Sequence, residues 1–413
     1  MASIGISGNV VPHVLDPAAG RHIGNLPITL KVAAVDAEPI GARGAYSHCD
    51  GVADEVEIQA AIALAAALGH GIRVELTDGH FYVTGSIITV PEVHIVGAGR
   101  ATTIVVPAGC NFPIITSSNL ADLHDAAIKS LYIDGVTNGG PGAMTDDNDA
   151  LCLHRCQHVL IEDVYADNVG GDGIWAPTPP VNAYTNWIKR CCFNGCGIGG
   201  IELGQARFIM AYNEVDNSVD QGIYIEDSPR ALLIGNHAHN NGADGIWVGF
   251  NCDNCIIVEG NTCEDNGLRG ITIDLSSECI IKGNTLKGNG GDGLLILGPG
   301  SLRTIVTGNV TIGNVGDQIS DFGTDSIIRD NVGHVTENKG IGTIVNPATT
   351  AVIAHGLSVT PAAEDIIITL MENPTADPGN IWVDTIDAVN FTVNCRNAPG
   401  VSDLDFGWQV QVV

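Results

Sequence analysis

Residues 222–261 decide the fold and read GIYIEDSPRALLIGNHAHNNGADGIWVGFNCDNCIIVEGN. The segment contains two copies of one pattern, which begins Gly-Ile-x-apolar at Gly222 and Gly245 and ends Gly-Asn at Asn236 and Asn261. Apolar residues at every second position are typical of strands, because successive strand side chains point to opposite faces. The segment therefore predicts short strands that are separated by turns.

The same two markers continue along the chain with one period. The pattern begins at Gly173, Gly200, Gly222, Gly245, Gly270 and Gly293, and its asparagine recurs at Asn213, Asn236, Asn261, Asn284, Asn309 and Asn331. Sequence periods of roughly 20–50 residues are typical of solenoids, propellers and arrays. No helical pattern lies between the markers, which excludes leucine-rich and ankyrin repeats.

An all-β solenoid with three short strands in each repeat fits these observations. Stacked asparagines would then pair their side-chain amides from one repeat to the next, which satisfies polar groups that burial would otherwise leave unpaired. The phrases GDGIW at 171–175 and ADGIW at 243–247, followed by GN-x-x-x-x-N, resemble the pectate-lyase-like superfamily of right-handed parallel β-helices. The resemblance covers about residues 44–338, and it implies the fold more specifically than the chemistry.

A capping helix is expected at about residues 54–68, ahead of the first repeats. Asp54 is the candidate N-cap, Glu57 stands at the capping-box position, and Gly69 is the candidate C-cap. The helix follows Cys49-Asp50-Gly51, and this opening resembles the entry of phage tailspikes and related carbohydrate-active β-helices.

Three parts of the chain are predicted: an N-terminal arm or adaptor at 1–43, the β-helix at 44–339, and a C-terminal β-sandwich at 340–413. The sandwich is expected from five alternating segments, Thr350–Ala354, Asp365–Leu370, Ile381–Ile386, Phe391–Cys395 and Phe406–Val412. The phrases His355-Gly356-Leu357 and Thr360-Pro361 resemble terminal domains of phage tail fibres, which implies a trimerisation or glycan-binding role. The alternative is a domain that only shields the last repeat from edge pairing.

Composition restricts the partners. Eighteen basic and 47 acidic residues give a net charge of −29, which disfavours nucleic acid, anionic membranes and polyanionic substrates. No stretch approaches the ~20 apolar residues of a membrane span. The start, MASIGISGNVVPH, shows no secretory signal, so either the protein is assembled in a cytoplasm or a signal has been removed. With the tailspike resemblance, the expected location is a virion tail or the extracellular space.

The twelve cysteines are predicted to be buried thiols of the core. Cys252 and Cys255 form a CxxC, but the later cysteines Cys263 and Cys279 match no zinc spacing. Cys255 and Cys279 begin the similar segments CIIVEGN and CIIKGN, which favours a stacked column of thiols. We therefore expect no metal and no cofactor; zinc or disulfides remain the alternative.

Strand alternation also predicts which side chains point outward. One outward column comprises Cys152, Trp175, Glu202, Tyr224, Trp247, Thr272, Leu295 and Ser320, and the next comprises His154, Pro177, Gly204, Glu226, Gly249, Asp274 and Leu297. The aromatic rings of Trp175, Tyr224 and Trp247 could stack on sugar rings. They could equally pack beneath a neighbouring subunit or a long loop.

The candidate catalytic pair is Glu202 and Glu226. Adjacent strands lie ~4.8 Å apart and two residues advance ~6.7 Å, so their backbone positions should be about 8 Å apart. That separation suits an inverting glycosidase, whose carboxylates lie roughly 6.5–9.5 Å apart. Glu202, between aromatic rings, is expected to have a raised pKa and to act as the acid, and Glu226 as the base. Asp274 is the reserve candidate.

Other acidic residues are expected to be structural. Asp172, Asp244 and Asp292 recur at one turn position, where aspartate caps backbone N–H groups, and Arg269 could form an ion pair there. The run Asp146-Asp147-Asn148-Asp149 lacks the order of a calcium loop and is expected to be a solvated loop, with calcium binding as the alternative.

Three functions remain open: a tailspike-like polysaccharide hydrolase, which is favoured, a non-catalytic glycan-binding fibre or adhesin, and a polysaccharide lyase. The chain lacks the Asp-Pro-His pattern of alginate epimerases. A lyase needs Lys, Arg or a metal to neutralise a uronate carboxylate, and the outward columns are nearly free of basic residues. A homotrimer is also expected, because outward apolar residues such as Trp247 and Leu295 would need cover.

Overall fold

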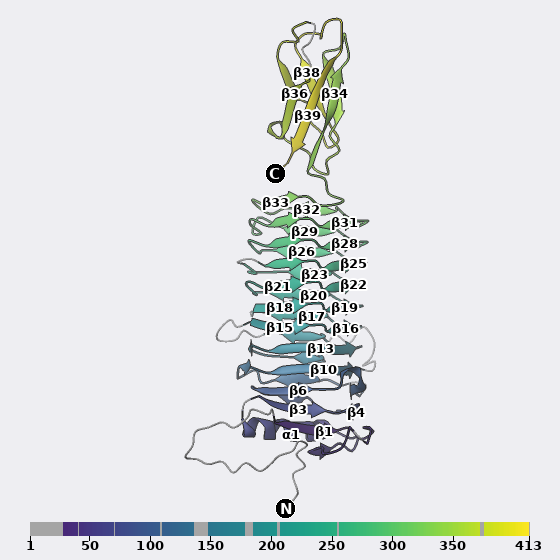
Figure 1. Ribbon diagram of the computed structural model, residues 1–413, viewed down its shortest axis with the longest axis vertical. Helices are drawn as coiled ribbons and strands as arrows, with labels where there is room; N and C mark the ends of the chain where they lie inside the picture. Colours follow the sequence, from purple (N-terminus) through teal and green to yellow (C-terminus); the bar gives the residue numbers. More distant parts are fainter. Residues whose placement is uncertain are drawn as a thin grey trace, which may run out of the picture.

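The computed structural model describes residues 28–39, 41–69, 71–107, 110–135, 148–177, 185–204, 207–253, 256–371 and 376–412. The chain forms a tall stack of coils, each coil being one turn of the chain around a common axis (Figure 1). Neighbouring coils pair through parallel strands, and the end of the chain forms a separate antiparallel unit. The predicted parallel β-helix is therefore confirmed.

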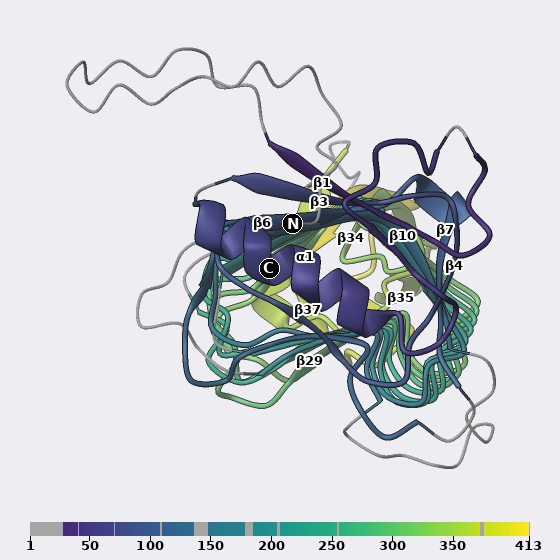
Figure 2. The ribbon, with the colours of Figure 1, turned by 90° about the horizontal axis from the view of Figure 1, so that it is seen from below.

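Three faces of strands enclose the core of the β-helix, as the view along the axis shows (Figure 2). The first face comprises β1 (Thr29–Ala33), β3 (Ile72–Leu76), β6 (Val93–Val96), the starts of β10 (Ala127–Asp134) and β13 (Leu160–Asp167), β15 (Thr185–Lys189), β18 (Arg207–Ala211), β21 (Leu232–Ile234), β24 (Ile257–Glu259), β27 (Ile280–Lys282), β30 (Ile305–Thr307) and β33 (Ile327–Arg329).

The second face continues the same sheet around a corner, because β10 and β13 span both faces. It comprises β4 (Gly79–Tyr82), β7 (Thr102–Val105), the ends of β10 and β13, β16 (Cys192–Asn194), β19 (Glu214–Asp216), β22 (His237–His239), β25 (Thr262–Glu264), β28 (Thr285–Lys287) and β31 (Val310–Ile312).

The third face is a sheet of ten strands. It comprises β5 (Ile87–Thr89), β8 (Ile115–Ser117), β11 (Leu151–Cys152), β14 (Ile174–Ala176), β17 (Ile201–Gly204), β20 (Ile223–Glu226), β23 (Ile246–Val248), β26 (Ile271–Asp274), β29 (Leu294–Leu297) and β32 (Ile319–Asp321). Smaller elements are β2 (Ser47–His48), which pairs with β1, the pair β9 (Leu123–His124) and β12 (Cys156–Gln157), and the short helix η1 (Gly99–Ala101).

Asparagine ladders hold the corners of successive coils together. The predicted ladder is present: the Asn213 side-chain amide donates to the Asn236 carbonyl oxygen at 2.9 Å, and the same bond repeats up to Asn331. A second ladder occupies the other end of the second face and joins Asn241, Asn266, Asn289 and Asn314. All of these side chains are buried, so each ladder satisfies amides that would otherwise be unpaired.

The capping helix α1 (Glu55–Leu68) lies across the N-terminal end of the coils and buries Ile58, Ala61, Ile62 and Ala65 against them (Figure 2). Gly69 ends the helix with a φ of 108°, as expected. The predicted capping box is wrong. The Asp54 carboxylate instead accepts backbone N–H groups of Gly51 and Tyr82, at 2.9 and 2.8 Å, and so ties the helix start to the first coils.

The C-terminal unit is a β-sandwich with its own core. One sheet has the order β34 (Glu337–Ile344), β39 (Leu404–Gln411), β36 (Ile366–Leu370), and the other has β35 (Thr350–Ala354), β38 (Asn390–Cys395), β37 (Ile381–Asp384). The short helix η2 (Ala363–Asp365) precedes β36. His355 is buried, and its Nδ1 atom accepts a hydrogen bond from the Leu357 N–H. Its Nε2 atom lies 3.1 Å from the Asp387 carbonyl oxygen. The His-Gly-Leu segment therefore has a structural role.

Several boundaries and columns differ from the sequence-based expectation. Strand β1 belongs to the first coil although an arm was expected up to residue 43, and β34 begins at Glu337, before the expected boundary. Ile280 pairs with Ile257, so Cys279 stacks on Ile256 rather than on Cys255, which lies outside the described residues. The predicted column of stacked thiols is therefore wrong, although ten of the eleven described cysteines are buried.

Replacing Asn284 with alanine should destabilise the β-helix by about 2–4 kcal/mol. Asn284 accepts the backbone N–H and the side-chain amide of Asn261 and donates to Val258 and Asn309, so several buried groups would lose partners. Urea unfolding followed by circular dichroism measures the change. The control is Asn194→Ala, whose hydrogen bond to Asn217 is exposed and which should change stability by less than about 0.5 kcal/mol. Equal losses in both variants would contradict the structural role of the ladder.

Candidate functional site

The third face carries the predicted outward column in the predicted register. Backbone pairing places successive members opposite one another in the order Cys152, Trp175, Glu202, Tyr224, Trp247, Thr272, Leu295 and Ser320. Trp175, Glu202, Tyr224 and Trp247 are partly exposed, and we call these four residues the aromatic stripe. The apolar residues on either side of them point into the core.

Glu202 lies between two rings of the aromatic stripe. It is directly opposite Trp175 on one side and Tyr224 on the other. Glu226 is opposite Gly204, so the two glutamates are in adjacent strands and two positions apart, as the sequence predicts. The hydroxyl of Tyr224 donates to the Glu226 carboxylate at 2.7 Å. This contact fixes the direction of the Glu226 side chain.

Local packing sets the position of the Tyr224 ring. The rings of Tyr224 and Trp247 have centroids 5.4 Å apart and are tilted by 55°. A Cβ atom at Gly249 would lie 3.0 Å from the Tyr224 ring, so the glycine leaves room for it. Burial, together with the hydrogen bond to Glu226, raises the pKa of Tyr224, which keeps the phenol protonated and able to donate.

The column is not equally open along its length. Thr272, Leu295 and Ser320 are buried, so the expectation that Leu295 needs cover from another subunit is wrong. Thr272 is a small side chain between Trp247 and Leu295, and its hydroxyl donates to Asp244. The reserve candidate Asp274 is half-buried, and this burial raises its pKa. The accessible part of the column is therefore the aromatic stripe.

The turn aspartates join neighbouring coils through the backbone. Asp172 accepts the N–H of Gly199, Asp244 that of Arg269, and Asp292 that of Asp317. The predicted structural role is confirmed. Arg269 also forms the predicted ion pair, with 3.7 Å between its Nη1 atom and the Asp244 carboxylate. Burial raises the pKa of Asp244 despite these contacts.

The acidic run at 146–149 differs from the expected solvated loop where it is described. Asp146 and Asp147 lie outside the described residues, but Asn148 and Asp149 are buried. Asn148 accepts the N–H of Phe112 and Asp149 accepts that of Asp172, so both side chains have a structural role.

Basic side chains gather on the first face rather than beside the aromatic stripe. Lys129, Lys189 and Arg190 surround Glu162. Burial alone would raise the pKa of Glu162, but hydrogen bonds from these cations outweigh it and lower the pKa to about 2. A hollow beside this cluster is lined by Lys129 and Trp187, among other residues. Sequence reasoning missed this group because outward positions were compared on the third face only.

Two groups of side chains could hold a metal among the residues that the structure describes. They are Glu214, His237 and His239 on the second face, and Cys49, Asp54 and Glu57 at the cap. None of the three second-face residues was predicted from the sequence. The available signal was the tripeptide His237-Ala238-His239, since residues two apart on a strand share one face. The expectation that the protein folds without a metal stays a prediction.

Comparison with known proteins agrees with the architecture. The family model described as "Right handed beta helix region" matches residues 117–258 and 253–333. The chain belongs to this right-handed β-helix family. No protein among those with curated functions matches the chain.

Similar solved structures include two enzyme modules and a phage protein. The Azotobacter vinelandii mannuronan C-5 epimerase AlgE6 A-module has a TM-score of 0.58 and 23% identity, over 65% of this chain and 76% of that chain. The mannuronan C-5 epimerase AlgE4 A-module of the same organism has a TM-score of 0.55 and 20% identity, over 73% of this chain and 96% of that chain. Pre-mature bacteriophage phi29 gene product 12 has a TM-score of 0.45 and 15% identity, over 63% of this chain and 44% of that chain. At these identities the likeness to the two epimerase modules is one of fold alone.

As to membranes, the part of the chain that the structure describes contains no helix that is long and apolar enough to cross one.

Two substitutions of Asp244 separate the contribution of its hydrogen bonds to stability from the contribution of its charge. Asp244→Ala should lower the free energy of unfolding by about 2–3 kcal/mol, because the Arg269 N–H and the Thr272 hydroxyl lose their acceptor. Asp244→Asn keeps an acceptor and removes a buried charge, so it should change stability by less than about 1 kcal/mol. Urea unfolding at neutral pH measures both. A loss in Asp244→Asn as large as that in Asp244→Ala would contradict this account.

The raised pKa of Asp244 also predicts how the stability of the protein depends on pH. The folded-state pKa of Asp244 is raised above its ordinary value of 3.8, so the folded chain holds this proton more tightly than the unfolded chain does. Relative to Asp244→Asn, the wild-type protein should therefore lose stability as the pH rises from 3.8 through the raised pKa. A constant difference between the two proteins over that range would contradict the raised pKa.

Proposed function

We propose that the protein binds a polysaccharide along the aromatic stripe and hydrolyses its glycosidic bonds with Glu202 and Glu226. One observation carries the proposal: the register places Glu202 between Trp175 and Tyr224, with Glu226 on the adjacent strand, on one accessible surface. Flat rings in a row suit the apolar faces of successive sugars. Strands hold these groups more rigidly than loops would.

The environments of the two carboxyl groups support different roles. Glu202 lies between aromatic rings, which disfavour a charge, so it would carry the proton that is given to the leaving oxygen. Glu226 accepts a hydrogen bond from Tyr224, which orients its carboxylate, and we assign it the role of the base that activates the water. With ~4.8 Å between strands and ~6.7 Å between alternate residues, the backbone positions are about 8 Å apart. That spacing supports inversion, which needs roughly 6.5–9.5 Å between the carboxyl groups.

A neutral polymer is the favoured substrate class. The net charge of −29 opposes a polyuronate, and the described cations near Glu162 lie on a different face from the stripe. The two epimerase modules act on mannuronan by their names, but this chain has no Asp-Pro-His pattern. The lyase alternative is disfavoured for the same electrostatic reason.

Glycan binding without cleavage is the second candidate. It is favoured by the hydrogen bond that already occupies the Glu226 carboxylate. Incubation with a panel of neutral and acidic polysaccharides separates the alternatives. New reducing ends indicate hydrolysis, ultraviolet-absorbing products indicate a lyase, and retention of the protein without cleavage indicates a binding protein.

Glu202→Gln should lower the turnover of the cleaved polymer by about 10²–10⁴-fold, the usual contribution of a general acid. Binding of the same polymer should persist, because glutamine preserves the shape of the side chain and leaves the rings in place. The matched control is Glu259→Gln on the first face, where the carboxylate pairs only with Lys282 among the contacts described for it. Turnover by Glu202→Gln at the wild-type rate would exclude the pair.

We further propose that the protein acts as a homotrimer on a virion tail or in the extracellular space. This rests on the resemblance of its C-terminal unit to tail-fibre domains and on the half-buried rings of the stripe. Light scattering at micromolar concentration should give three times the monomer mass of 42.9 kDa. A monomer mass at that concentration would exclude the trimer, while leaving the proposed chemistry to be tested by the Glu202 variant.

A further inference from the structure

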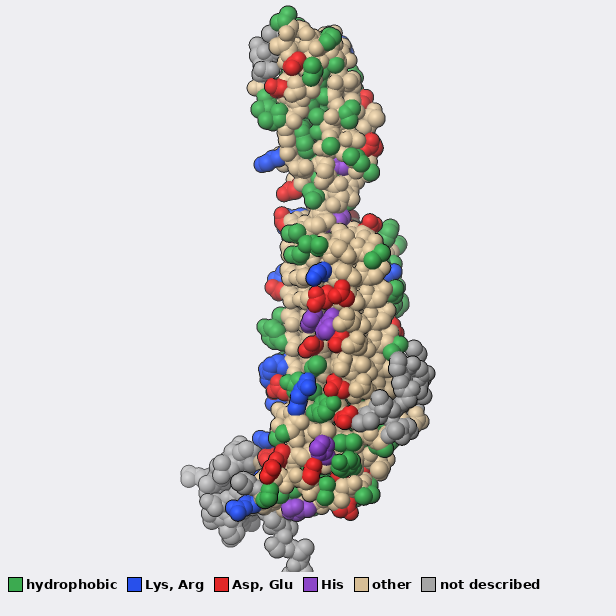
Figure 3. Space-filling model, turned by 90° about the vertical axis from the view of Figure 1, so that its right-hand side faces the viewer, with side chains coloured by type: hydrophobic (Ala, Val, Ile, Leu, Met, Phe, Trp, Pro, Cys, Tyr) green, Lys and Arg blue, Asp and Glu red, His purple; other side chains and the backbone are tan. Residues whose placement is uncertain are grey.

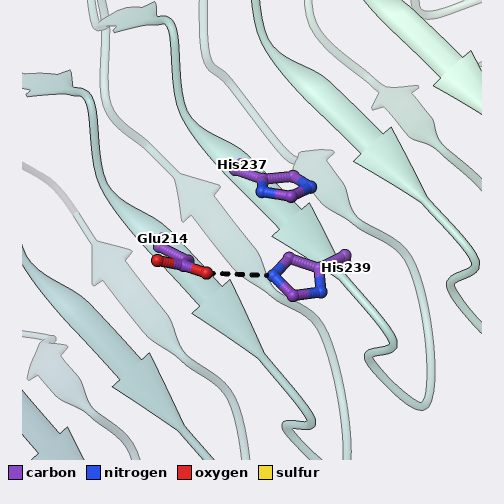
Figure 4. A group of neighbouring side chains, drawn as sticks. All are labelled: Glu214, His237 and His239. Carbon is purple, nitrogen blue, oxygen red and sulfur yellow. Dashed lines mark hydrogen bonds and ion pairs between the residues drawn. The ribbon is translucent and has the colours of Figure 1, made fainter.

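Two histidines and a glutamate meet on the second face of the β-helix, away from the aromatic stripe. His237 and His239 are alternate residues of β22, so both side chains point outward from the same strand. Glu214 lies on the adjacent strand β19, directly opposite His237. Figure 4 shows the three side chains next to one another, and Figure 3 shows histidine and acidic side chains gathered on this side of the molecule.

The three side chains bring nitrogen and oxygen atoms to one point. One such atom from each residue lies within 4.8 Å of the others. His239 Nε2 lies 3.3 Å from Glu214 Oε1. In a tetrahedral zinc site with bonds of ~2.0–2.1 Å, neighbouring ligand atoms are about 3.3 Å apart. His239 and Glu214 therefore already have the separation of two ligands of one ion.

His239 is held in the orientation that a metal ligand needs. Its Nδ1 atom lies 3.1 Å from the Asp216 carboxylate and 2.9 Å from the Asn240 amide nitrogen, and that amide also donates to Asp216 at 3.0 Å. A ligating histidine commonly donates its second N–H to a carboxylate, which fixes the ring and its tautomer. Asn240 and Asp216 thus hold the ring through its Nδ1 edge, and Nε2 points at Glu214. A metal ion bound by Nε2 and Glu214 would replace the hydrogen bond between them.

His237 completes the set after a small movement. Its ring stacks on that of His239 with centroids 4.1 Å apart, and its Nε2 atom lies 3.1 Å from Glu264. A metal lies in the plane of each imidazole that binds it, so His237 must turn out of the stack to join. Its side chain is 38% exposed, which leaves room for that rotation.

We propose that Glu214, His237 and His239 bind one divalent transition-metal ion of the zinc type. Two imidazoles and one carboxylate form a donor set that suits Zn²⁺, Co²⁺ and Ni²⁺, whereas Ca²⁺ and Mg²⁺ prefer oxygen ligands only. Glu214 is 53% exposed, so water can take the fourth position. The ion would link two coils through β19 and β22. The site lies on the second face, and it does not depend on the proposed glycan chemistry.

The cap group is the weaker candidate. The carboxylate of Asp54 already accepts two backbone N–H groups, and burial raises the pKa of the Cys49 thiol, which opposes the thiolate that a metal needs. These contacts indicate a structural role at the start of α1.

Titration calorimetry of the chelator-treated full chain with ZnCl₂ tests the proposal. We expect one equivalent to bind, and His239→Ala or Glu214→Gln to weaken that binding by more than about 100-fold. Asp216→Asn should weaken it by about 10–100-fold, because it orients His239 without touching the ion. The matched control is His124→Gln, an exposed histidine beside Asp125, which should bind Zn²⁺ as the wild type does.

Cobalt identifies the ligands independently. Co²⁺ bound by nitrogen and oxygen atoms in a four- or five-coordinate site gives visible absorption bands, and thiolate ligands add a charge-transfer band in the near ultraviolet. We expect the visible bands without the thiolate band, and their loss in His237→Gln, whose unchanged thermal melting would show that it is folded. No Zn²⁺ binding by the wild type, undiminished binding by His239→Ala, or a thiolate band would each overturn the proposal.

Discussion

In the two ladders that run from Asn213 to Asn331 and from Asn241 to Asn314, buried asparagine amides donate to the asparagine of the next coil, and the register of these coils depends on that pairing. An unpaired amide in the core costs free energy, so the ladders resist any slip between coils. A slip by one residue would also turn every core side chain outward. The ladders and the apolar columns therefore enforce the same register, and the turn aspartates such as Asp244 add a bond of the same kind on the third face.

Because the register is held in this way, side chains of successive coils form columns, and each face can carry its own chemistry. The third face places Glu202 between two aromatic rings, and the second face places Glu214 opposite a pair of histidines. The backbone geometry is the same in both places. What differs is which residue type occupies the outward position, and the family fold alone therefore specifies neither activity.

The sequence was sufficient to predict the features that recur in every repeat of the β-helix. The glycine and asparagine markers predicted the β-helix, the first ladder and the order of the outward column, since each follows from the period and from strand alternation. The sequence was insufficient where contacts with residues distant in the chain determine the burial or the partner of a side chain. Leu295 has the same alternation as Trp247 but is buried, and Cys279 begins a segment like that of Cys255 yet stacks on Ile256. The Asp54 carboxylate binds a loop and a strand, because tertiary partners outcompeted the helix N–H groups. His237 and His239 were missed because no outward column was compared on their face.

The proposed function is tested by a crystal structure of the Glu202→Gln protein with an oligosaccharide of the polymer that the wild type cleaves or retains. We expect sugar rings along the third face, stacked on Trp175, Tyr224 and Trp247, with the glycosidic oxygen next to residue 202. We also expect Glu226 on the opposite side of the reacting sugar. Sugar bound on the first face, at the hollow beside Trp187, with the aromatic stripe empty, would contradict the proposal.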